Sequence, residues 1–130
     1  MPYRLKPIPD DVETVGKYKD AQGNTECVTF ARKDTGAMHT STWNRGVQVK
    51  GAIPGSILEG TVIATFDSTG RYPTDGLGKH AAIYLSHNSH GIEVYDQWNK
   101  QGRVKKRRIR FNNSHALKRS DNADTFYVVE

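Results

Sequence analysis

Apolar residues in the second half of the chain alternate with polar ones, which is the period of β-strands. From Gly60 onward, these alternating segments are separated by Gly, Asn, Asp and Ser, the residues that favour turns. The pattern predicts five strands, over residues 61–66, 80–86, 92–98, 104–111 and 125–129. Residues 87–91 include Asn, Ser and Gly and predict a hairpin between the second and third strands.

A short helix is predicted ahead of these strands, over residues 25–33, with Asn24 or Thr25 as its N-terminal cap. Helical spacing puts its apolar and small side chains on neighbouring faces: Cys27, Val28, Phe30 and Ala31. Residues 38–56 are irregular and predict a second short helix or a loop. A helix followed by a run of strands predicts an α+β fold, with the helix packed on an antiparallel sheet of about five strands.

The length of 130 residues predicts a single domain, because a chain of this size buries roughly two-thirds of its unfolded surface. Residues 1–23 are rich in Pro, Asp, Lys and Gly and should wrap the surface, with Val12 and Val15 as anchors. The longest apolar run, residues 81–85, is far shorter than the ~20 residues that span a bilayer, so no membrane insertion is expected. The start of the chain shows no apolar signal segment, so we expect synthesis in the cytoplasm and export by another route.

Positive charge is concentrated in one predicted strand. The net charge is +5, and residues 103–111 carry most of the excess. Such a stretch favours polyanions such as nucleic acid, anionic lipid or cell-wall polymer. Alternating apolar residues flank the run, as in a strand with a solvated face, and no helix-turn-helix, zinc-finger or RNA-binding aromatic motif accompanies it. A nucleic-acid partner is therefore not expected.

The single cysteine, Cys27, cannot form an internal disulfide, so it either packs as a small apolar residue or reacts. Its place at the predicted start of a helix favours the thiolate form. His80 opens the most apolar predicted strand and offers an imidazole that can carry a proton at neutral pH. A thiolate nucleophile and an imidazole, here carried by a helix start and a strand, are the two groups that a cysteine amidase or peptidase requires.

A third polar residue is needed to orient the imidazole, and the neighbouring predicted strand offers Asp96 and Gln97. Strand alternation leaves both open. A two-residue turn at 88–89 sets Gln97 opposite His80, whereas a three-residue turn through His90 puts Asp96 on the same face as His80. The oxyanion of the intermediate needs the Cys27 N–H and one further donor, for which the sequence offers Gln22, Asn24 and Thr25 without a choice among them.

Five blocks of the chain resemble known cell-wall enzymes. Cys27 at a helix start and the run Gly-Lys-His-Ala-Ala-Ile-Tyr-Leu at 78–85 resemble the catalytic blocks of NlpC-like and CHAP peptidases, which have papain folds. Together with 60–66, 70–73 and 95–98, these blocks make the chain similar, over nearly its full length, to the second family of type VI secretion amidase effectors.

The resemblance implies one papain-like amidase domain over residues 1–130 that hydrolyses peptide crosslinks in bacterial peptidoglycan. Cys27 and His80 would be catalytic, and Asp96 is preferred over Gln97, because these families carry their third polar residue at this place. It implies a monomeric antibacterial effector that acts on stem peptides in a rival's periplasm, with an immunity protein in the producer. The scissile bond would join diaminopimelate to D-alanine, and no cofactor would be needed.

The sequence also allows two other interpretations, a zinc site and a basic binding module. His87 and His90 stand three apart in a turn, but without the paired-ligand spacing of a zinc site, so no metal is expected. The chain could also be a non-catalytic basic module that binds a polyanion through residues 103–111, with Cys27 buried and inert.

Aromatic residues that could line a substrate groove or simply pack in the core are Trp43, Tyr72, Tyr84, Tyr95 and Trp98.

Overall fold

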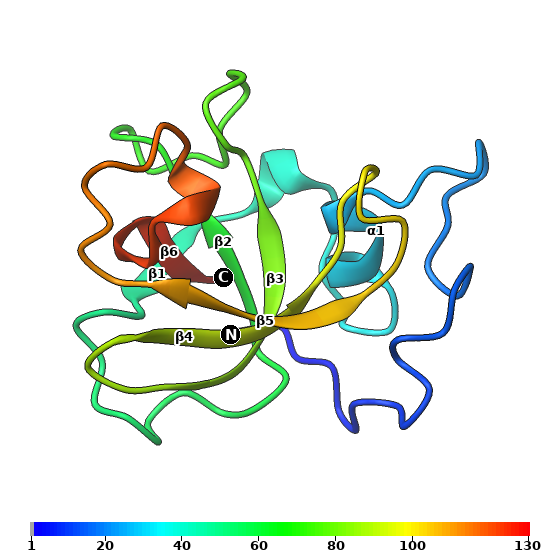
Figure 1. Ribbon diagram of the computed structural model, residues 1–130, viewed down its shortest axis with the longest axis horizontal. Coiled ribbons are helices and arrows are strands. Elements are labelled where there is room, and N and C mark those ends of the chain that lie inside the picture. The colour runs from blue at the N-terminus through cyan, green and yellow to red at the C-terminus, as the bar shows by residue number, and fades with distance from the viewer. Residues whose placement is uncertain (1) are drawn as a thin grey trace.

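A computed structural model describes residues 2–130. Within that range, six strands form one sheet in the order β1-β6-β2-β3-β4-β5, and every neighbouring pair is antiparallel (Figure 1). The strands are β1 Arg45–Gln48, β2 Val62–Thr65, β3 Ala81–His87, β4 Gly91–Asp96, β5 Lys105–Arg110 and β6 Phe126–Val129. The five predicted strands are all present, within a few residues of the expected bounds. No helix in the described residues is long and apolar enough to cross a membrane.

The helix α1, Cys27–Arg32, packs on the sheet beside β3 and carries Cys27 as its first residue. Its buried side chains, Phe30 and Ala31, enter the core. There the Phe30 and Tyr18 rings pack edge to face, with their centres 4.7 Å apart. The predicted caps are wrong. Glu26 precedes the helix, and no side chain caps its first turn.

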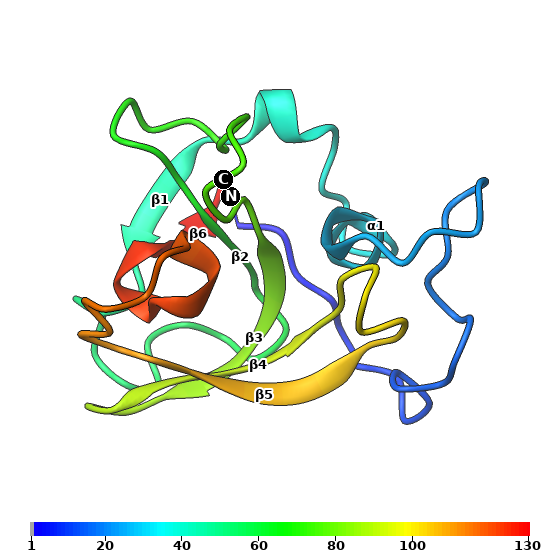
Figure 2. The same cartoon turned by 45° about the horizontal axis from the view of Figure 1, so that its top comes forward.

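The sheet is covered on both faces, so its central strands are buried throughout. All four residues of β2 are buried, and alternate residues belong to two separate cores. Val62 and Ala64 face the core under α1, whereas Ile63 faces the core under the C-terminal turns η2 (Arg119–Asp121) and η3 (Ala123–Thr125). Figure 2 shows α1 on one side of β3 and these turns on the other.

The region 38–56 contains a strand that the sequence pattern did not predict. It begins with a single turn, η1 (Thr40–Thr42), and continues into β1 at the edge of the sheet. β1 is four residues long and never fully buried, and Gly46 contacts β6 so closely that a Cβ atom would lie 2.7 Å from the Val128 carbonyl oxygen. Pairing with a strand eighty residues later, not local pattern, stabilises β1. Of the two predicted N-terminal anchors, Val12 is buried but Val15 is exposed.

The β3–β4 hairpin contains an irregularity that positions the site. Its loop has three residues, and next to it His87 pairs with Ile92 and Ser86 with Glu93. The register then shifts at a bulge, so that Tyr84 pairs with Val94. An extra residue in one strand exchanges the faces of all the pairs beyond it. The bulge thus decides which of the two polar residues at the end of β4 shares a face with His80.

Candidate active site

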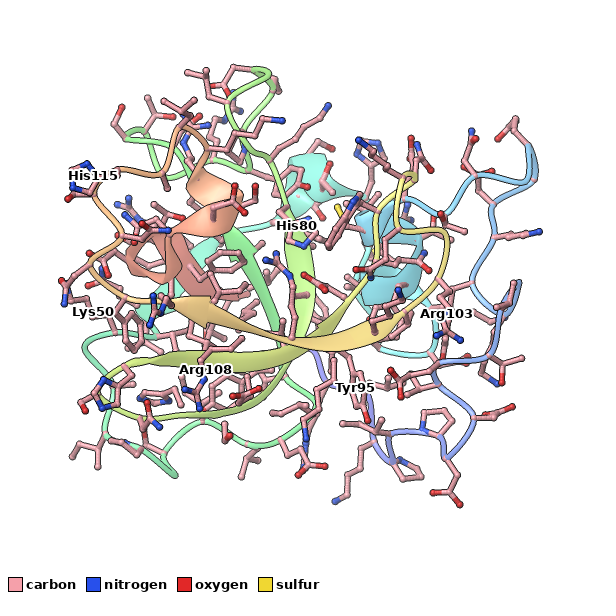
Figure 3. All side chains as sticks on the ribbon, viewed as in Figure 1. Lys50, His80, Tyr95, Arg103, Arg108 and His115 are labelled. Atoms are coloured by element: carbon pink, nitrogen blue, oxygen red, sulfur yellow. The ribbon has the colours of Figure 1, made fainter. Side chains whose placement is uncertain are left out.

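Cys27 and His80 lie at a pocket of about 290 Å³ between α1, Tyr72 and Trp98. Cys27 is half-buried at the start of α1, and His80 is buried directly before β3. Packing of α1 against β3 brings the two side chains together although they are far apart in the sequence. Figure 3 shows His80 between α1 and the C-terminal turns.

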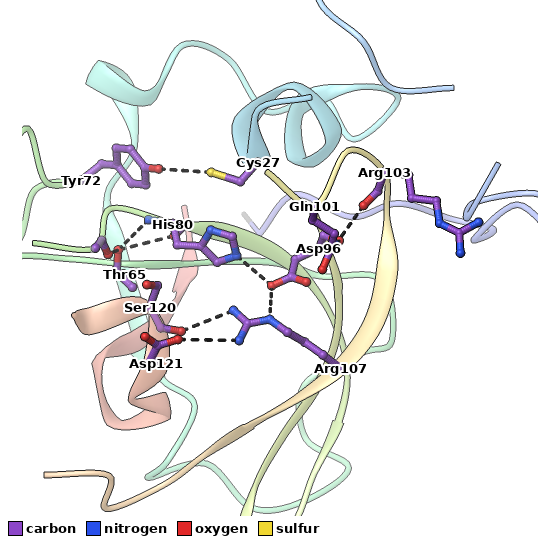
Figure 4. A network of polar contacts seen from close by, with 11 residues as sticks. Cys27, Thr65, Tyr72, His80, Asp96, Gln101, Arg103, Arg107, Ser120 and Asp121 are labelled. Carbon is purple, nitrogen blue, oxygen red and sulfur yellow. Dashed lines mark hydrogen bonds and ion pairs between the residues drawn. The ribbon is translucent and has the colours of Figure 1, made fainter. Parts of the chain in front are cut away.

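The imidazole of His80 is held by Asp96, at the end of β4. His80 Nε2 lies 2.8 Å from Asp96 Oδ2, and the carboxylate is fully buried (Figure 4). This bond occupies Nε2, so Nδ1 is the ring nitrogen that can exchange a proton with the Cys27 thiol. The structure therefore brings together the three residues that sequence reasoning selected: Cys27, His80 and Asp96.

Gln97, the alternative partner of His80, has a different place. Its side-chain amide donates to the carbonyl oxygens of Tyr18 and Glu26, at 2.9 and 2.8 Å. Glu26 directly precedes Cys27, so buried Gln97 fastens the start of α1 to the end of β4.

A fourth charged residue, Arg107 of β5, completes the cluster. Its Nε donates to the same Oδ2 of Asp96 at 2.7 Å (Figure 4). Its guanidinium lies 5.2 Å from the centre of the Trp98 ring and contacts the Ser120 carbonyl oxygen at 3.4 Å. The run 103–111 is predicted as a strand with a solvated face, and its other cations in β5 are exposed. Arg107 is the exception, because its side chain turns inward to Asp96.

The electrostatics of the site favour an ion pair between the thiol and the imidazole. Burial acts to raise the pKa of Cys27, but the hydrogen bond and charge of His80, with the Ala81 N–H and the Tyr72 hydroxyl, lower it below its ordinary value. Burial acts to lower the pKa of His80, but bonds to Asp96 and Cys27 raise it to about 9. Between these two pKa values the pair is a thiolate and an imidazolium, the reactive form of a cysteine nucleophile.

Comparison with known proteins shows which family the chain belongs to. The model of the family "Domesticated amidase effector 2" matches residues 6–129. This chain belongs to that family.

Three relatives illustrate the family. The type VI secretion amidase effector 2 protein of Salmonella typhi is 36% identical over 130 residues, covering 92% of this chain and 91% of the relative. The domesticated amidase effector 2 of Ixodes scapularis is 40% identical over 119 residues, covering 88% and 78%. A solved structure of type 6 secretion amidase effector 2 (Tae2) superposes with a TM-score of 0.79 at 32% identity, over 97% of this chain and 93% of that one. The predicted membership in the second amidase-effector family is confirmed.

Tyr72 is a site residue that sequence reasoning placed only among possible groove aromatics. Its hydroxyl lies 3.8 Å from Cys27 Sγ, and its ring packs edge-on against Trp43 at 5.1 Å. Burial, together with the nearby thiolate, raises the pKa of Tyr72, so the hydroxyl stays protonated as a donor. No local pattern reveals it, because Tyr72 lies in the loop between β2 and β3.

The three residues considered as oxyanion donors lie elsewhere. Gln22 and Asn24 are exposed in a turn in which their backbone N–H groups bind Asp20. Thr25 is buried and donates its hydroxyl to the Trp98 carbonyl oxygen at 3.2 Å. None of the three contacts Cys27 Sγ, whereas the Tyr72 hydroxyl lies 3.8 Å from it.

Proposed function

We propose that this protein is a cysteine amidase with a papain-like active site, and that it hydrolyses peptide crosslinks of bacterial peptidoglycan as a type VI secretion effector. The observation that carries the proposal is the alignment of Cys27, His80 and buried Asp96 at an open pocket. Family membership supports an amidase, and the names of the relatives from Salmonella typhi and Ixodes scapularis support an amidase effector.

The reaction follows from the positions of these groups. The Cys27 thiolate attacks the carbonyl carbon of the scissile amide, and the Tyr72 hydroxyl and the Cys27 N–H donate to the resulting oxyanion. His80 Nδ1–H then gives its proton to the leaving amine, the C–N bond breaks, and an acyl-thioester remains. Neutral His80 next takes one proton from water as that water attacks the thioester, and the C–S bond breaks to restore the thiolate beside protonated His80. The product leaves as a carboxylic acid, which loses its remaining proton to solvent. Asp96 orients the ring throughout.

The rival function, a non-catalytic basic binding module, is not favoured. It requires an inert, buried Cys27, whereas the thiol lies at a pocket with a lowered pKa and an imidazole partner. Apart from Arg108, which pairs with Glu93, the exposed cations of β5 (Lys105, Lys106 and Arg110) are then suited to draw the enzyme to the anionic cell wall.

Digestion of purified peptidoglycan tests the proposed function. We expect crosslinked fragments to disappear and uncrosslinked stem peptides to accumulate, with cleavage between diaminopimelate and D-alanine. Mass analysis of the soluble fragments identifies the bond, and Cys27→Ala is the matched control. Sacculi that keep their crosslinks with the active enzyme would contradict the proposal.

The compartment of action gives a second prediction. Expressed in the cytoplasm of a Gram-negative host, the protein should be tolerated, because its proposed substrate lies outside the inner membrane. Fused to a periplasmic signal peptide, it should lyse the cells, and co-expression of an immunity protein in the periplasm should protect them. Culture density after induction measures both. Equal toxicity of the two forms, or lysis by periplasmic Cys27→Ala, would argue against a wall amidase acting in the periplasm.

A further inference from the structure

Arg107 differs from the other cations of β5. Lys105, Lys106, Arg108 and Arg110 are exposed, whereas the Arg107 side chain is only 24% exposed and lies on the inward face with buried Ile109. β5 pairs with β4 so that Arg107 stands opposite Val94, one diagonal step from Asp96. This strand pairing places the Arg107 guanidinium against the Asp96 carboxylate, which in turn contacts His80.

Asp96 carries a charge that its surroundings must neutralise. The carboxylate is fully buried, and both of its hydrogen bonds, from His80 and from Arg107, end on Oδ2. The other oxygen, Oδ1, has no partner in the described residues. A buried anion is costly unless a cation is paired with it. His80 supplies a cation only while it is protonated, but Arg107 is charged at every step.

We propose that Arg107 is a positioning residue that neutralises buried Asp96 whenever His80 gives its proton away, and so allows His80 to act first as an acid and then as a base. This inference rests on the proposed cysteine mechanism. Without Arg107, each step that leaves His80 neutral would also leave Asp96 as an unpaired buried anion. His80 would then hold its proton, and the acyl-enzyme would lack a base.

The charged and titratable groups around His80 decide the sign of the effect. Cys27 of α1 and Asp96 of β4 act on the imidazole directly. Behind them, Tyr72 of the loop before β3 contacts Cys27, Arg107 of β5 contacts Asp96, and Asp121 of η2 lies 4.0 Å from Arg107. In the free enzyme, Cys27 and Asp96 together raise the pKa of His80 to about 9. In the acyl-enzyme the thiolate is consumed, so Asp96 alone raises it. Arg107 weakens that remaining effect, because a cation on Oδ2 opposes protonation of the ring.

The test is the pH dependence of turnover in Arg107→Met, with a short crosslinked stem-peptide fragment as substrate. We expect kcat near pH 7 to fall about tenfold or more, and the acidic limb of the kcat profile to move up by about one pH unit or more. Alkylation of Cys27 by iodoacetamide should keep its wild-type pH dependence, because the imidazolium form of His80 still neutralises Asp96 in the free enzyme.

Two further variants separate charge from structure. Arg108→Met removes a cation from the same strand, but Arg108 pairs with Glu93 and lies on the other side of β5 from His80 (Figure 3), so its profile should match the wild type. Arg107→Lys keeps the charge, and its acidic limb should stay near that of the wild type even if kcat falls.

Three outcomes would overturn the inference: an unmoved acidic limb in Arg107→Met, an equal shift in Arg107→Lys, or alkylation that requires higher pH in Arg107→Met. If Arg107→Met fails to fold, Arg107→Gln takes its place, because it also removes the charge and should shift the acidic limb in the same way. Activity in Cys27→Ala would instead overturn the proposed function.

Discussion

Replacing Cys27 or His80 with alanine should each lower hydrolysis of peptidoglycan fragments by a factor of about 10⁴ or more, and the double variant should be little worse than either single one. Nucleophile and base act as one unit, so their losses do not add. The fold should persist, because Cys27 is half-buried at a pocket and loses few contacts. Steady-state kinetics with circular dichroism of each variant measure both expectations.

Thiol alkylation provides the control for this prediction. The lowered pKa of Cys27 should make it react with iodoacetamide at a pH below that of an ordinary thiol, and His80→Ala should abolish this advantage, because His80 is what overcomes the effect of burial. In the wild type, the imidazolium is lost as the pH rises through about 9, so acylation should decline above that pH. Near-normal turnover by Cys27→Ala would show that the thiol mechanism is wrong.

Asp96→Asn should reduce turnover about a hundredfold or more while the structure is kept. A neutral amide orients the imidazole less well and does not stabilise the imidazolium, although it can still contact His80 and Arg107 across the same distances. The asparagine variant should also lower the pKa of His80, because the carboxylate is a principal group that raises it. The pH profile of kcat/KM, with its basic limb moved to lower pH, measures this change.

Gln97→Ala is the matched comparison for Asp96→Asn. Gln97 holds the carbonyl oxygens of Tyr18 and Glu26, so its loss leaves two acceptors without their partner. We expect the free energy of unfolding to fall by about 1–3 kcal/mol, with a smaller loss of turnover and an unmoved pH profile. If Gln97→Ala were instead the more damaging change to the pH profile, the orienting role would pass from Asp96 to Gln97.

Local pattern in the sequence was enough to predict most of the framework. The period of two after Gly60 predicted five of the six strands, and the short apolar helix was predicted with Cys27 in its first turn. These features depend on neighbouring residues, whose alternation directly reflects burial on a sheet or helix face. β1 was missed because it is a short, half-exposed edge strand, and its stability comes from contact with β6.

Sequence chemistry also selected Cys27 and His80 as the reactive pair, because the thiol is unique and one histidine opens the most apolar strand. It left Asp96 and Gln97 open, since a shift of one residue in strand register exchanges their faces. The bulge next to Tyr84 makes that choice and places Asp96 beside His80. The number of turn residues in the sequence does not predict whether a bulge forms inside the strand, so the register could not be derived from it.

The sequence by itself determined the elements, the nucleophile and the imidazole, because these follow from residue type and local spacing. Only the tertiary structure decided which partners meet. Tyr72 reaches Cys27 from a loop, and Arg107 reaches Asp96 across the β4–β5 pair. In the sequence, Arg107 is one of several adjacent cations with the same composition and charge. Its inward direction is set by strand pairing and by the buried carboxylate that attracts it, both of which exist only in the folded chain.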